Sequence, residues 1–194
     1  MPGFERLEKA IQMKGGRSVM IELNSEKKRE LAVRLESLGN KILFAARDEL
    51  YLGMRFLDVA LSSFSYQMDT SVSPFGTDGN SIYFHPQYLG GMYRENRILV
   101  NRGYLHMVFH CIFRHMVKRE MDDRYWDLSC DIAAEHMIDG NHHRSIRFSR
   151  SLLRRETYRK LEAEGKVLNA ERVYALLACL LYTSPSPRDG LLSR

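Results

Sequence analysis

The chain has 194 residues, of which 44% are hydrophobic and 27% are charged, and its formal net charge is +5 at pH 7. This length is enough for one well-buried domain, and the composition is that of an ordinary globular protein. The sequence has no apolar run near the ~18 residues of a membrane span and no secretory pattern at its amino terminus. Three cysteines without C-x-x-C spacing do not indicate a disulfide framework, so we expect a reducing, cytoplasmic location.

The spacing of apolar residues and turn formers predicts an α+β fold, mainly helical with a small antiparallel sheet, in a single domain. The predicted elements are a helix at 26–49, a strand near 60–67, a strand at 81–85 that Pro86 ends, and helices at about 100–119, 126–138, 151–164 and from Asn169.

Two histidines stand four residues apart in the apolar stretch LHMVFHCIFRH, residues 105–115. On a helix, His106 and His110 lie about 40° apart, and the surrounding residues are apolar on nearly all sides, which is typical of a buried helix. Two buried imidazoles need polar partners, and one metal ion satisfies both. His115 lies about 180° from His106 on an uninterrupted helix, and no glycine breaks that helix, so we interpret His115 as a packing residue or as support for a ligand.

A third ligand is predicted in WDLSCDIAAEHMID, residues 126–139. Asp131 and Glu135 are four residues apart and flanked by apolar positions, so both face the same way. Two imidazoles and one carboxylate are three protein ligands, which leave one position of a Zn²⁺ ion open, as in catalytic zinc sites. The alternative is that these acids pair with Arg124 or His136 on the helix surface.

Three blocks in this order, TDGNSIYFHPQYL, YLHMVFHCIFRH and YWDLSCDIAAEHMID, resemble the metallopeptidase-like domain that precedes a von Willebrand factor A-like domain in bacterial proteins. The resemblance spans about residues 30–178. It implies a zincin-like fold, zinc ligands at His106 and His110, and a role for Asp131 as the aspartate of the third block. It also implies a peptide or protein substrate and a MoxR-type AAA ATPase as a partner.

The chain departs from the H-E-x-x-H pattern at Met107, which stands where these enzymes have a glutamate. That glutamate accepts a proton from the attacking water and contributes typically ~10²–10⁴-fold, and methionine cannot replace it. Glu135, one turn beyond Asp131, is the candidate for a substitute catalytic base. We therefore predict a zinc-binding domain with doubtful hydrolytic activity. The alternative is a non-catalytic, metal-stabilised interaction module that works with a von Willebrand A-like domain and an AAA ATPase.

Two further segments bear on partners and boundaries. The stretch 141–160 has seven arginines and lysines against Glu156, but its aromatic residues are few, which favours a solvated connection over a nucleic-acid site. Residues 179–194, CLLYTSPSPRDGLLSR, resemble translated sequencing-adapter read-through. We expect a truncated domain at 1–178 and an artefactual tail at 179–194, the alternative being a genuine disordered tail.

Overall fold

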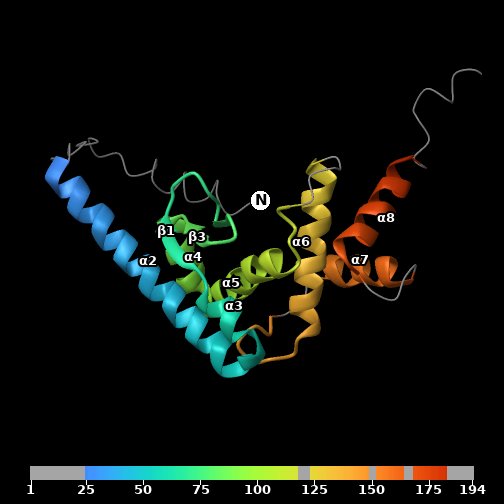
Figure 1. Ribbon diagram of the computed structural model, residues 1–194, viewed down its shortest axis with the longest axis horizontal. Helices are drawn as coiled ribbons and strands as arrows, with labels where there is room; N and C mark the ends of the chain where they lie inside the picture. The colour runs from blue at the N-terminus through green and yellow to red at the C-terminus, as the bar shows by residue number, and fades with distance from the viewer. Residues whose placement is uncertain (1–24, 118–122, 149–151, 164–167, 183–194) are drawn as a thin grey trace, which may run out of the picture. The chain divides into compact units, whose positions relative to one another are not determined.

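The structure is a computed structural model that describes residues 25–117, 123–148, 152–163 and 168–182 (Figure 1). The chain divides into two compact units, residues 1–34 and residues 35–194, and of the first unit only the start of one helix is described. The described elements are α2 (Ser25–Gly53), the short 3₁₀ helix η1 (Arg55–Leu57), α3 (Asp58–Ser62), β1 (Ser65–Met68), β2 (Phe75–Thr77), β3 (Ser81–Phe84), α4 (Pro86–Glu95), α5 (Arg97–Ile112), α6 (Asp123–Gly140), α7 (Leu152–Ala163) and α8 (Ala170–Tyr182). The predicted α+β class, mainly helical with a small sheet, is confirmed.

The sheet is mixed, so the prediction of an antiparallel sheet is wrong for one of its two strand pairs. β3 lies in the middle, antiparallel to β2 and parallel to β1. The chain reverses direction after β1 and again after β2, so β1 and β3 run the same way, and they become neighbours because β3 inserts between the two earlier strands. β3 is also the most buried strand, with Ile82 and Phe84 fully buried, as expected for a strand that has a neighbour on each side.

Several element boundaries differ from the predictions for identifiable reasons. The strand predicted near 60–67 is a helical turn, α3, followed by β1. Pro86 does end β3, but it also occupies the first turn of α4, where its missing N–H costs nothing and the His85 side chain accepts a hydrogen bond from the Gln87 N–H. β2 and α4 were not predicted.

Asp78 shapes the turn that joins β2 to β3. Its Oδ1 atom accepts hydrogen bonds from the backbone N–H groups of Asn80 and Ser81, at 2.9 and 2.7 Å, and its Oδ2 atom accepts one from the Tyr83 hydroxyl at 2.9 Å. Gly79 has a φ of 95°, a backbone conformation that residues with a side chain rarely adopt. The TDG sequence is therefore a structural turn that holds β2 against β3.

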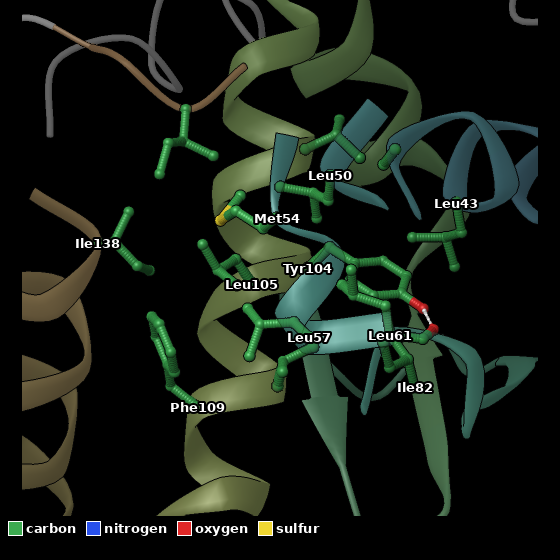
Figure 2. Packing of buried hydrophobic residues seen from close by; sticks show 14 of the residues in the cluster. Leu43, Leu50, Met54, Leu57, Leu61, Ile82, Tyr104, Leu105, Phe109 and Ile138 are labelled. Atoms are coloured by element: carbon green, nitrogen blue, oxygen red, sulfur yellow. Dashed lines mark hydrogen bonds between the residues drawn. The ribbon is translucent and has the colours of Figure 1, made fainter. Parts of the chain in front are cut away.

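The main hydrophobic core surrounds α5, whose residues Tyr104, Leu105 and Val108 are fully buried. Figure 2 shows Tyr104 and Leu105 among leucines of the preceding helices, with the Tyr104 hydroxyl donating to the Leu61 carbonyl oxygen at 2.8 Å. α5 is thus fixed by contacts on several sides, as its all-round apolar sequence predicts. No described helix is long and apolar enough to span a membrane.

Helix α8 runs to Tyr182, so the domain boundary predicted between 178 and 179 falls inside a helix. The rest of the predicted tail, residues 183–194, lies outside the described residues, as do the ends of the helices predicted at 100–119 and 151–164.

Candidate metal centre

The candidate site lies between α5 and α6, which pack against each other. Each helix contributes a polar stripe in which successive members are four residues apart and therefore share one face. The members are Arg102, His106 and His110 on α5, and Asp131, Glu135 and Asp139 on α6.

Three predicted ligands come together where the two stripes meet. The Nε2 atoms of His106 and His110 are 2.8 Å apart, and the Asp131 Oδ1 atom lies 3.3 Å from the first and 3.2 Å from the second. In the described part of the chain, these residues form the only group of three or more potential metal-ligand side chains whose donor atoms all lie within 4.8 Å of one another.

The donor set fits a zinc ion. Metal–donor distances of ~2.0–2.2 Å in a tetrahedral site place donor atoms roughly 3.3–3.6 Å apart. The two separations from Asp131, 3.3 and 3.2 Å, are close to this spacing, whereas the 2.8 Å between the two Nε2 atoms is a hydrogen-bond distance that would have to widen around a metal. Two imidazoles with a carboxylate are donors that suit zinc. That these residues bind a metal remains a prediction, but their convergence is what the prediction requires.

Burial and the neighbouring carboxylates have opposite effects on the pKa of His106. Burial lowers the pKa of His106, but hydrogen bonds to Asp131 and Glu135, together with their charges, outweigh it and raise the pKa to about 9. Burial raises the pKa of Asp131, yet its hydrogen bonds to the two histidines hold it well below the ordinary value. Without a metal, a protonated His106 therefore neutralises carboxylate charge in the site.

Glu135 contacts the back of the His106 ring. Its Oε1 atom lies 3.0 Å from His106 Nδ1, and its Oε2 atom accepts a hydrogen bond from Arg102 at 2.7 Å. Burial raises the pKa of Glu135, but the partners His106 and Arg102 prevail and lower it to about 2. The prediction that Glu135 acts as a substitute base is not tested by these contacts. Of the alternative partners of these acids, His136 contacts Glu162, and the Arg124 side chain is not described.

Arg102 is the site residue that sequence reasoning missed. It lies one helical turn before His106 and is buried, with an exposed side-chain fraction of 8%. Its guanidinium group donates to Glu135, to Asp139 at 2.7 Å and to the Ile146 carbonyl oxygen at 3.0 Å. The available signal was an arginine four residues before His106, on the same face of an otherwise apolar helix.

His115 was excluded as a ligand on the premise that the helix continues without interruption from His106 to His115. This premise is wrong, because α5 ends at Ile112. The His115 N–H donates to the His110 carbonyl and the Arg114 N–H to the Cys111 carbonyl, the pattern of a Schellman motif. Arg114, with a φ of 55°, takes the left-handed position that usually belongs to glycine. His115 therefore folds back, with its ring centroid 5.1 Å from that of His110, but it is not part of the three-residue group.

A cleft of about 570 Å³ opens beside the site. His106, Asp131 and Glu135 line it, together with Met107 and with Phe75 of β2. Met107, which stands where H-E-x-x-H enzymes have a glutamate, is partly buried and packs against the main core. Two of the three ligand candidates, His106 and Asp131, thus line the same cleft as Met107.

Residues 41–180 match the protein family described as a putative metallopeptidase domain. The match covers more than half of the chain and includes every residue of the two stripes, so the chain belongs to this family. Comparison with curated proteins and with solved structures finds no significant match.

Proposed function

We propose that this protein is a zinc-binding domain of the metallopeptidase family, with His106, His110 and Asp131 as ligands and with low hydrolytic activity because of Met107. The convergence of three donor atoms from two helices is the observation that carries the proposal. Zinc bound there would act as a Lewis acid that polarises a peptide carbonyl group.

The cleft supports a peptide as substrate. Phe75 lines the cleft, and its strand β2 forms an edge of the described sheet, with β3 as its partner strand. An edge strand offers backbone donors and acceptors to an extended peptide, which could pair along it and reach the ligand side chains. The substrate would thus be bound by its backbone, with little demand on its sequence.

Hydrolysis also requires a group that accepts a proton from the attacking water within ~2.6–3.2 Å. Among the described residues that line the cleft, the carboxylates are Asp131, which contacts both histidines, and Glu135, which contacts His106 and Arg102. Met107 has no proton-accepting group. We therefore expect the protein to bind metal and peptide but to hydrolyse the peptide slowly.

Met107 also favours a second candidate function. A domain that binds metal without an efficient base could serve as an interaction module, in which the metal stabilises the packing of α5 against α6. A von Willebrand A-like domain and a MoxR-type AAA ATPase are the partners we propose for that role. The described cysteines, at 111, 130 and 179, do not form disulfides, which supports a reducing compartment such as the cytoplasm.

Metal analysis of the purified full chain tests the proposal. We expect about one zinc per chain, and loss of stoichiometric zinc in His106→Ala and in His110→Ala. His142→Ala is the matched control, because His142 is exposed and lies outside the three-residue group. Full zinc content in the His106→Ala, His110→Ala double variant would show that the site is misplaced.

A further inference from the structure

The residues behind the candidate ligands form a chain of contacts that ends in the protein interior. Arg102 is at its centre, and a buried arginine is costly unless its charge is compensated. Here its guanidinium group donates to two carboxylates and one carbonyl oxygen, from Glu135, Asp139 and Ile146. These contacts fix the guanidinium group between α6 and the segment that follows it.

The position of Arg102 determines which oxygen of Glu135 faces His106. An arginine offers only donors, so Glu135 Oε2, at 2.7 Å, must accept. The other oxygen, Oε1, then faces His106 Nδ1 at 3.0 Å and accepts a hydrogen bond from the N–H group of that nitrogen. With one proton held on Nδ1, it is Nε2 that loses its proton when a metal binds, and its lone pair then points toward His110 and Asp131.

We propose that Glu135 and Arg102 are positioning residues for the metal, in which Arg102 orients Glu135 and Glu135 orients and polarises His106. The inference rests on the proposed zinc function and deepens it. A carboxylate that holds the far nitrogen of a ligating histidine fixes its ring orientation and raises its affinity for the metal. For Glu135 to act instead as the base, one oxygen would have to leave His106 or Arg102.

The chain contains a matched pair for comparison. His136 Nε2 and Glu162 Oε1 are 2.7 Å apart, so this pair resembles the one between His106 and Glu135. It is more exposed, with side-chain fractions of 27% and 53%, and it lies outside the group of potential metal ligands. Loss of the Glu162 carboxylate should therefore affect a histidine contact without affecting metal binding.

Zinc affinity in competition with a chromogenic chelator tests the proposal. Glu135→Gln should bind zinc ~10–100-fold more weakly than the parent, because the amide NH₂ must face one of two donors, Arg102 or the His106 Nδ1–H, and the negative charge that polarises His106 is lost. Glu162→Gln should bind zinc as tightly as the parent. Equal affinity for Glu135→Gln and the parent would overturn the inference, whereas a parent that binds no zinc would overturn the proposed function instead.

Two further measurements separate positioning from a general loss of structure. Arg102→Lys keeps the positive charge but loses the paired donors, so we expect weaker zinc binding even if Glu135→Gln fails to fold. In the zinc-loaded parent, the imidazole ¹H–¹⁵N spectrum should show a proton on His106 Nδ1 that exchanges slowly with water. An unprotonated Nδ1, or unchanged affinity in Arg102→Lys, would contradict the proposal.

Discussion

Restoring a glutamate at position 107 tests the reasoning about activity most directly. Met107→Glu places a carboxylate on the residue after His106, in the cleft that His106 and Asp131 line. A positioned general base contributes ~10²–10⁴-fold, or about 2.7–5.5 kcal/mol of activation free energy at 1.36 kcal/mol per tenfold. We expect peptide hydrolysis to rise by at least ~10²-fold, with zinc content unchanged.

Met107→Glu should also lower the stability of the domain, and the partial burial of Met107 sets an upper limit on this loss. Met107 is partly buried against the core, so its loss costs less than the ~1.5–3 kcal/mol of a fully buried methionine. The new carboxylate also adds negative charge near Asp131 and Glu135, which bound zinc would offset. A domain stable by ~5–15 kcal/mol should remain folded, with a lower melting temperature that zinc partly restores.

The assay is cleavage of an unstructured fluorogenic peptide by zinc-loaded protein, with metal content and thermal unfolding measured on the same samples. Met92→Glu is the matched control, since Met92 lines the same cleft and is also partly buried against the core, but lies on α4. Equal activation by both variants would show that added charge, and not the position beside His106, matters. A zinc-loaded Met107→Glu variant without activity would refute the account and favour the interaction module.

Two further predictions concern stability. In Gly103→Ala the new methyl group would overlap the Phe75 ring, so the free energy of unfolding should fall by ~1–3 kcal/mol. Gly90→Ala, in open space on α4, should instead raise the free energy of unfolding by up to ~1 kcal/mol. Equal effects of the two variants in urea titrations would disprove this packing argument. Burial and the nearby charge of His110 lower the pKa of His115 from 6.5 to about 4, so below pH 6.5 the unfolded chain takes up a proton that the folded chain refuses. The free energy of unfolding of the metal-free protein should therefore fall as the pH drops from 6.5 to about 4, and the fall should be smaller in His115→Phe. An unchanged pH dependence in this variant would contradict the lowered pKa.

The local patterns of the sequence were enough to predict most of the longer helices and the three candidate ligands, although not α4 or Arg102. Apolar residues on nearly all sides predicted a buried helix at about 100–119, and α5 is a buried helix that ends earlier, at Ile112. The four-residue spacings of His106 with His110 and of Asp131 with Glu135 place each pair on one helix face, whatever the rest of the fold does. This periodicity is a property of the backbone geometry, so it could be read directly from the sequence.

Only the tertiary structure decided how these faces meet. Sequence spacing does not tell which turn of α6 lies opposite His106, and that register brings Asp131 to both histidines while Glu135 lies behind one of them. The burial of Arg102 and its partners also depends on contacts 33 to 44 residues away along the chain. Non-local packing sets such pairings, and no local propensity encodes them.

The sheet and the end of α5 show the same limit. The turn residues before 81–85 and Pro86 after them predicted β3, but its position between β1 and β2 depends on non-local pairing that these local signals do not encode. Arg114 adopts a left-handed conformation that its own preferences disfavour, because the two backbone hydrogen bonds of the helix cap offset the cost. The sequence by itself determined most of the longer helices and the ligand candidates, and the packing of helices from distant parts of the chain determined how the candidates are arranged.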